Sequence, residues 1–187
     1  STVNDLKRDS SDVTWTVTPQ WSIGDDTMLF LTAAHGFKAG GFNTGFGRLP
    51  IAQREFADED VMHYEAGVKL DLLDGRLRLA GSVFSTEYEE YQDAAFVGAS
   101  FTVGNAEKVE LQGLELEGEM LVGEHLTADF SISYADLVYD KNTRGQCYAG
   151  RPSNSTTSAG ACDLSGEHPL NAPEWKTQLG AEYTQPF

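Results

Sequence analysis

The chain has 187 residues and carries 13 Lys and Arg against 29 Asp and Glu, a formal net charge of −16. This acidity argues against nucleic acid as a partner and against a basic patch for anionic lipid. No apolar run reaches the roughly 18 residues of a membrane-spanning helix, so any crossing of a membrane would have to use strands. Residues 1–15 lack the apolar stretch of a signal peptide, so we expect either a cytosolic chain or a piece of a longer one.

Apolar and polar side chains alternate with period two along most of the chain, which predicts strands with two different faces. In residues 62–70 one face carries His63, Glu65 and Lys69 and the other is apolar. The same alternation recurs in residues 13–18, 126–134 and 175–183. We predict about seven antiparallel strands, at 12–23, 27–37, 61–72, 76–96, 101–121, 125–139 and 173–184.

The predicted strand 101–121 changes phase. Val109 and Leu111 are apolar at odd positions, whereas Leu114 and Leu116 continue the pattern at even ones. A β-bulge at Gly113 would absorb one extra residue and explain the change. The alternative is a break in the strand at that point.

Tight turn signals fall at equal spacing, at residues 24–26, 73–75 and 122–124. Between them lie the longer polar stretches 38–60 and 140–172 and a short one near 97–100. Short turns at one end and mostly long loops at the other are typical of outer-membrane barrels, in which the short turns are periplasmic. We therefore predict an all-β fold, an antiparallel transmembrane β-barrel segment with short periplasmic turns and long extracellular loops.

A soluble β-sandwich also alternates, with its apolar face inward. Three features favour the membrane barrel over it. Several predicted strands exceed the usual five or six residues. The polar face carries many carboxylates, which a hydrated lumen tolerates better than a dry core. Aromatic residues gather toward the ends of the apolar faces, as in the girdles of barrels: Trp15, Trp21, Tyr64, Tyr134, Tyr139, Trp175 and Tyr183.

The two cysteines, Cys147 and Cys162, enclose a stretch rich in Ser, Thr, Gly and Ala. They form no CxxC pair and have no clustered histidines, so the pattern favours a loop disulfide in an oxidising compartment over a metal site. Two unpaired loop thiols are the alternative.

No motif for catalysis or for a cofactor emerges from the spacing of reactive residues. The glycine-rich run 36–47 lacks the Gly-Lys-Ser/Thr ending of a phosphate loop, and Gly-x-Ser-x-Gly does not occur. The four histidines show no metal-ligand spacing. An acidic stretch within residues 55–65 lacks the twelve-residue calcium-loop pattern. We therefore expect no enzyme, no metal site and no cofactor.

Four segments resemble TonB-dependent outer-membrane receptors. MLFLTAAHGFKAGGFNTG resembles a strand and loop start of that family, and HYEAGVKLDLLDGRLRLAGSVFSTEYEEYQD resembles its Tyr-Glu-x-Gly-x-Lys strand, Leu-Asp-Gly-Arg turn and returning strand. VGNAEKVELQGLELEGEM resembles the Gly-x-Glu-x-Glu strand, and NAPEWKTQLGAEYTQPF an Ala-Pro strand start. Together they cover nearly the whole chain in family order.

The resemblance implies a 22-stranded barrel, plugged by an N-terminal domain, that imports scarce ligands with energy from TonB; ferric siderophores are the commonest ligands. Its partners would be outer-membrane lipid, such a small-molecule ligand, and TonB through the plug. Residues 1–187 are expected to be an interior barrel segment without the plug domain or the C-terminal strand. A passive porin-like channel is one alternative, and a soluble β-domain that binds a carbohydrate or a protein is another.

The resemblance also implies that ligand contacts come from the upper lumen wall and the extracellular loops. There, cations would suit an anionic ferric chelate, and aromatic rings would suit its apolar parts. The candidate contacts are Lys38, Phe42, Phe46, Arg48, Arg54, Tyr88, Tyr91 and Arg144, with Lys141 and Arg151 as further cations.

Overall fold

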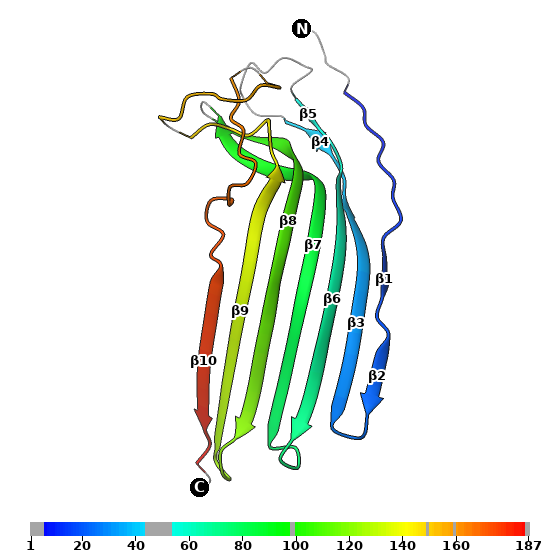
Figure 1. Ribbon diagram of the computed structural model, residues 1–187, viewed down its shortest axis with the longest axis vertical. Coiled ribbons are helices and arrows are strands. Elements are labelled where there is room, and N and C mark those ends of the chain that lie inside the picture. Colours follow the sequence, from blue (N-terminus) through cyan, green and yellow to red (C-terminus); the bar gives the residue numbers. More distant parts are fainter. Residues whose placement is uncertain (1–5, 44–53, 98–99, 149, 159, 186–187) are drawn as a thin grey trace.

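A computed structural model describes residues 6–43, 54–97, 100–148, 150–158 and 160–185. The chain forms one curved antiparallel sheet of eight strands, in the order β1-β3-β6-β7-β8-β9-β10, with β2 also paired to β3 (Figure 1). Two further short strands, β4 and β5, pair with each other. The bounds are β1 Trp15–Val17, β2 Gln20–Ile23, β3 Thr27–Lys38, β4 Gly41–Phe42, β5 Glu55–Phe56, β6 Glu59–Leu72, β7 Leu77–Val97, β8 Ser100–Leu121, β9 Leu126–Lys141 and β10 Trp175–Tyr183.

Every neighbouring pair in the sheet is antiparallel, so the connections alternate between its two ends. The tight turns lie at one end, here called the turn end, and the long connections lie at the other, the loop end (Figure 1). The turn between β6 and β7 places Leu73, Asp74 and Gly75 at φ values of 56°, 55° and 80°. Positive φ at successive residues is the backbone of a tight hairpin. The predicted rhythm of short turns and long loops is confirmed.

Two predicted segments differ from the structure. The expected strand 12–23 is divided into β1 and β2 at Thr18-Pro19, because Pro19 has no N–H for the ladder. The register against β3 does not slip across this gap, since Trp15 pairs with His35 and Gln20 with Phe30. The stretch 38–60, expected to be irregular, contains the small β4–β5 hairpin.

The bulge predicted at Gly113 is wrong. Gly113 pairs with Phe84 on β7 and with Ala135 on β9, and the register continues unbroken on both sides of it. The irregularity between β8 and β9 lies nearer the loop end, between Lys108 and Glu110. The hydrophobic pattern changes phase because the surroundings of the strand change: near the loop end, Val109 is covered by a loop and is fully buried.

The two faces of the sheet differ in chemistry. The face that carries Leu29, Val68, Leu116 and Leu179 is here called the apolar face, and several of its leucines are exposed, Leu179 by 79%. The opposite face, the polar face, carries charged and amide side chains: Glu65, Lys69, Arg78, Glu115, Glu117, Glu119 and Gln178.

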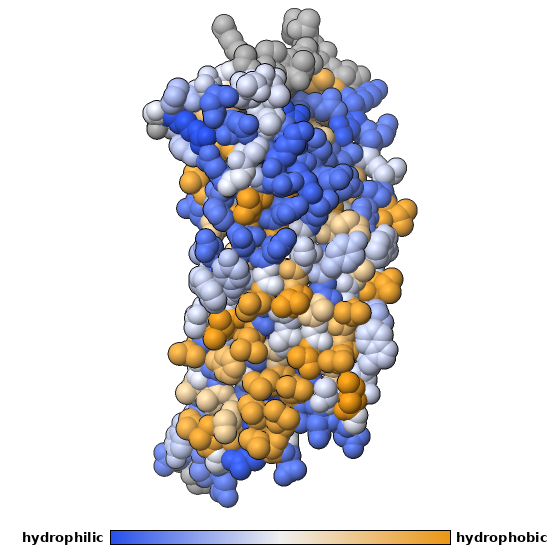
Figure 2. Space-filling model, viewed as in Figure 1, coloured by the Kyte–Doolittle hydropathy of each residue, from blue (hydrophilic) through white to orange (hydrophobic). Residues whose placement is uncertain are grey.

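Aromatic side chains mark the limits of the apolar band. Trp15, Tyr64 and Trp175 are exposed on the apolar face toward the loop end, and Tyr183 is exposed near the turn end. Trp175 and Tyr183 bound β10 eight residues apart, which at about 3.3 Å per residue is roughly 26 Å. For a strand tilted by about 40° this length spans roughly 20 Å of height, close to the apolar belt of about 25 Å that outer-membrane barrels present to lipid. Figure 2 shows apolar side chains gathered in the part of the molecule nearer the turn end and hydrophilic ones toward the loop end.

Within the described residues, no helix is long and apolar enough to cross a membrane.

Candidate functional site

The polar face is hollowed toward the turn end. A groove of about 780 Å³ lies there, and its wall carries both signs of charge. Lys69 and Arg78 line it together with carboxylates from neighbouring strands; its charged and amide residues are Asp25, Asp26, Lys69, Asp71, Arg78, Glu117, Glu119, Asp129 and Gln178. Such a surface stays hydrated or contacts polar partners, because burying these groups without partners would be costly.

The loop after β9 covers the polar face at the loop end. Cys147 and Cys162 form a disulfide with a Cα–Cα distance of 5.1 Å, and Cys162 is completely buried. Around it lies the small buried core of Ala106, Val109, Tyr139 and Leu164. The backbone N–H groups of Cys162 and Leu164 donate to the carbonyls of Gly145 and Asn142 at 2.8 Å each. The loop is therefore tied to the sheet by covalent, apolar and backbone contacts.

An ion pair and its hydrogen bonds hold the outer part of this loop. Arg151 Nη1 lies 2.7 Å from Glu167 Oε1 and also donates a hydrogen bond to the Tyr148 hydroxyl at 2.7 Å. Its charge is therefore already paired within the loop. The hydrogen bond from Tyr148 and the one from Arg151 hold the pKa of Glu167 below its usual value. Arg151 thus serves the loop structure.

A second set of contacts holds the segment between β3 and β6 against β7 and β8. The Gln92 N–H donates to the buried Glu59 carboxylate at 2.6 Å, and the Gln92 amide donates to the carbonyls of Ala39 and Ala57 at 3.1 Å. Asn105 accepts from the Ala57 N–H at 2.8 Å. This polar network fastens the loop end of β6 and its preceding loop to the neighbouring hairpin.

The candidate ligand contacts fall into three groups. Tyr88 and Tyr91 pack edge to face, with ring centroids 5.5 Å apart, against the small buried core. Glu90 between them takes a φ of 51°, which interrupts the alternation and lets both rings reach the same core. Both rings are partly buried, so each keeps only part of its surface open at the loop end.

Two of the candidate cations, Arg144 and Lys38, lie near carboxylates of the described chain. Arg144 lies 3.3 Å from Glu90 and 3.5 Å from Glu107, and Lys38 lies 3.9 Å from Glu59 while remaining 59% exposed. A ligand that used Arg144 would have to share it with these carboxylates. Lys141 is exposed at the end of β9.

Phe42, in β4, is half-buried, and Arg54 directly precedes β5, where its carbonyl accepts from Asn43. Phe46 and Arg48 lie outside the described residues. The structure therefore brings Tyr88 and Tyr91 close to Arg144, which belongs to the loop after β9. It places Lys38 at the loop end of β3 and Phe42 in β4, which follows it.

Glu90 and Glu107 were missed as members of this region, although both belong to the acidic sequence that surrounds Tyr88, Tyr91 and Lys108. Their role depends on Arg144, which is more than thirty residues away in sequence and arrives through the long loop. A pattern of charges along one strand cannot reveal such a partner.

A protein-family description, TonB dependent receptor-like beta-barrel, matches residues 1–187. The chain belongs to this family. The resemblance drawn from the four sequence segments is thereby confirmed, and so is the antiparallel β-barrel fold class. The family is one of receptors and transporters of the outer membrane of Gram-negative bacteria, not of enzymes.

The metal-pseudopaline receptor CntO of Pseudomonas aeruginosa is 31% identical over 141 residues, which are 73% of this chain and 19% of CntO. The chain thus spans about a fifth of the length of this receptor. Solved structures share the fold. The siderophore receptor PiuA of Acinetobacter baumannii matches with a TM-score of 0.66 at 20% identity, over 91% of this chain and 23% of PiuA.

The ferric yersiniabactin uptake receptor FyuA of Yersinia pestis matches with a TM-score of 0.61 at 18% identity, over 89% of this chain and 22% of FyuA. The ferric-catecholate import receptor Fiu of Escherichia coli K12 matches with a TM-score of 0.57 at 15% identity, over 91% of this chain and 22% of Fiu.

Proposed function

We propose that the chain is part of the barrel wall of an outer-membrane receptor that imports a metal chelate, most simply a ferric siderophore, with energy from TonB. The observation that carries the proposal is the difference between the two faces of one sheet. The apolar face has a band bounded by aromatic residues, and the polar face is charged and is covered at the loop end by the loop after β9. A wall of this kind separates lipid from a hydrated lumen.

The names of the relatives support the ligand class. CntO is a metal-pseudopaline receptor and PiuA a siderophore receptor, while FyuA is a ferric yersiniabactin uptake receptor and Fiu a ferric-catecholate import receptor. We further propose that residues 1–187 form an interior segment of the barrel domain. The plug that contacts TonB and the remaining strands would belong to the rest of the receptor, since this chain spans about a fifth of CntO.

Within that frame, the region of Tyr88, Tyr91 and Arg144 is the proposed contact for the chelate. The exposed parts of the two rings offer stacking surface, and the guanidinium of Arg144 offers two donors to the paired oxygens of a carboxylate or catecholate. The neighbouring carboxylates Glu90 and Glu107 would hold Arg144 in place between ligands.

The test is uptake of ⁵⁵Fe-labelled chelates by cells that have or lack the full-length receptor, each with TonB intact or disabled. We expect uptake of at least one chelate to need both proteins. Uptake that persists without TonB would instead favour a passive channel, and recovery of the receptor in soluble fractions without detergent would favour a soluble binding domain.

Replacing Tyr91 by Leu in the full-length receptor should weaken binding of the transported chelate, because the aromatic surface is lost while the apolar contact with the buried core is kept. The matched control is Tyr183→Leu, which removes an exposed ring from the apolar face near the turn end. A chelate affinity that is the same in wild type and Tyr91→Leu would remove this ring from the proposed contact region.

A further inference from the structure

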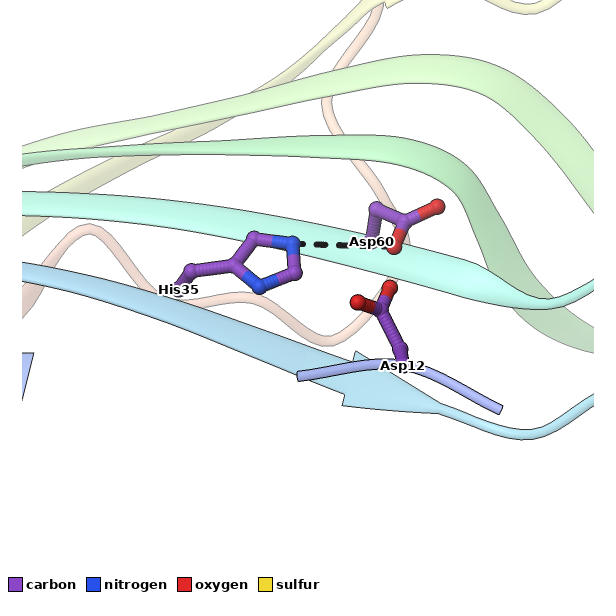
Figure 3. Close-up of side chains that lie close together, drawn as sticks. All are labelled: Asp12, His35 and Asp60. Atoms are coloured by element: carbon purple, nitrogen blue, oxygen red, sulfur yellow. Dashed lines mark ion pairs between the residues drawn. The ribbon is translucent and has the colours of Figure 1, made fainter. Parts of the chain in front are cut away.

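Three side chains with metal-binding atoms meet on the apolar face, just above its aromatic limit. They are Asp12, from the segment that precedes β1, His35 on β3 and Asp60 on β6 (Figure 3). One ligand atom from each lies within 4.8 Å of the other two, and His35 Nε2 lies 3.7 Å from Asp60 Oδ1. Figure 3 shows the imidazole and both carboxylates directed toward one another.

The hydrogen bond at the other ring nitrogen prepares His35 for this role. Its Nδ1 lies 3.0 Å from the carbonyl oxygen of Val13, an atom that can only accept a hydrogen bond. The ring proton of the neutral imidazole therefore belongs on Nδ1, which leaves the lone pair of Nε2 directed toward the carboxylates. Metal-binding histidines are commonly oriented by such a bond to a backbone carbonyl.

Neighbouring groups hold the ring and add negative charge. The Trp15 ring stacks on His35 with centroids 6.4 Å apart and an interplanar angle of 25°. Glu89 on β7 is the register partner of Asp60, so a third carboxylate lies on the adjacent strand. Two to three carboxylates around a neutral imidazole favour a cation electrostatically.

The distances fit a small divalent ion. Ligand atoms that surround Zn²⁺ at about 2.0–2.2 Å in a tetrahedron lie roughly 3.4 Å from one another. The separations here, 3.7 Å and up to 4.8 Å, need contractions of about 0.3 Å and up to about 1.4 Å to reach that spacing. Asp12 is exposed and lies outside the strands, so rotation of its side chain is the simplest source of this contraction.

We propose that Asp12, His35 and Asp60 form a binding site for a divalent first-row transition metal ion, with Zn²⁺ as the test ion. Imidazole together with carboxylate oxygens suits this class of metal. Bound there, the ion joins the segment before β1 to β3 and β6 and fixes that segment on the wall of the sheet. The site is separate from the proposed chelate contacts, which lie on the polar face.

The sequence did not predict this site. The three residues come from three segments, each more than twenty residues from the next, and the antiparallel register of β1, β3 and β6 brings them together. No local motif records that arrangement.

The test is titration of the metal-free, full-length receptor in detergent with ZnCl₂ alone, followed by calorimetry. We expect His35→Gln and Asp12→Asn each to weaken one equivalent of bound Zn²⁺ by at least ~10-fold, the scale on which even second-shell changes act. The matched control is His63→Gln, which removes a histidine that lies 4.0 Å from one carboxylate, Glu65. This control should keep the wild-type titration.

Zinc should also protect the segment 6–14 from proteolysis in wild type but not in Asp12→Asn. Asp12 lies outside the strands, so this variant decides the question even if His35→Gln fails to assemble. Identical titrations of wild type, His35→Gln and Asp12→Asn would overturn the proposal. Because the readout is binding of zinc and not uptake of a chelate, the result is independent of the proposed transport function.

Discussion

The ring of Phe84 on β7 lies directly over Gly113 on β8. A Cβ atom built on Gly113 would come within 2.5 Å of Phe84 Cζ and would collide with the carbonyl oxygen of Tyr134. Phe30 covers Gly67 in the same way, with its Cε1 atom 2.5 Å from the position of a Cβ. Aromatic rings packed across cross-strand glycines stabilise curved sheets and fix their register.

Gly113→Ala should therefore destabilise the assembled barrel by about 1–3 kcal/mol, the usual cost of overpacking. The matched control is Gly81→Ala, because a Cβ there would meet Leu116 Cδ1 at an ordinary 3.6 Å. Folded and unfolded receptor can be separated on gels without boiling across a urea series. Equal midpoints for the two variants would show that Phe84 and the Tyr134 carbonyl both move aside without cost.

The apolar band gives a second prediction, about the orientation of β10. Leu179 lies midway between Trp175 and Tyr183 and is 79% exposed, which places it at the centre of the proposed lipid contact. Leu179→Arg should reduce the stability of the membrane-embedded receptor by ~2–4 kcal/mol. The control Gln178→Arg puts the same side chain on the polar face and should leave assembly close to wild type. Similar losses in both variants would contradict the assignment of the faces.

The sequence predicted the fold well because alternation and turn signals are local properties. The bounds of β3, β6, β7, β8, β9 and β10 lie within about two residues of the predicted ones, as expected for assigned strand ends. The errors arose where a strand leaves one environment for another. Val109 is apolar on the polar face because the loop after β9 packs against it, and no local pattern shows where on the sheet that predicted loop packs.

The candidate sites were less accessible to prediction for the same physical reason. The disulfide between Cys147 and Cys162 could be predicted because both cysteines lie in one predicted loop. The pairing of Arg144 with Glu107 instead depends on how the loop returns to the sheet. The Asp12, His35 and Asp60 cluster depends on the register between β3 and β6, which pairs Phe37 with Asp60 and His35 with Met62.

The disulfide supports a third prediction. Removing it by Cys147→Ala with Cys162→Ala should destabilise the loop between β9 and β10 by roughly 3 kcal/mol, as the chain-entropy model gives for a loop of about 15 residues. The strand ladder makes no use of this bond, so the barrel itself should persist. Limited proteolysis should cut the loop faster while the unboiled receptor keeps its mobility on gels. Loss of that mobility would mean that the loop stabilises the barrel as a whole.

The last prediction concerns acid and the segment before β1. Arg8 Nη2 lies 3.0 Å from Asp58 Oδ2, and the same carboxylate accepts hydrogen bonds from the Gly40 N–H at 2.6 Å and the Ser10 hydroxyl at 2.7 Å. The hydrogen bond from Arg8, followed by those from Gly40 and Ser10, lowers the pKa of Asp58 from 3.8 to about 2. These contacts tie the segment before β1 to the loop that precedes β6.

A carboxylate whose pKa is lower in the folded state stabilises that state fully above its unfolded pKa. The contribution of Asp58 should therefore be intact above about pH 4 and be lost as the pH falls through 3.8 toward 2. Amide exchange of residues 6–14, corrected for the intrinsic effect of pH, should rise over that window.

Asp58→Asn should show the faster exchange already at pH 6, because the ion pair with Arg8 is gone. The control Asp74→Asn changes an exposed aspartate in the turn between β6 and β7, at the opposite end of the sheet, and should exchange like wild type. If the exchange of residues 6–14 in Asp58→Asn equals that of wild type at pH 6, the carboxylate does not hold the segment.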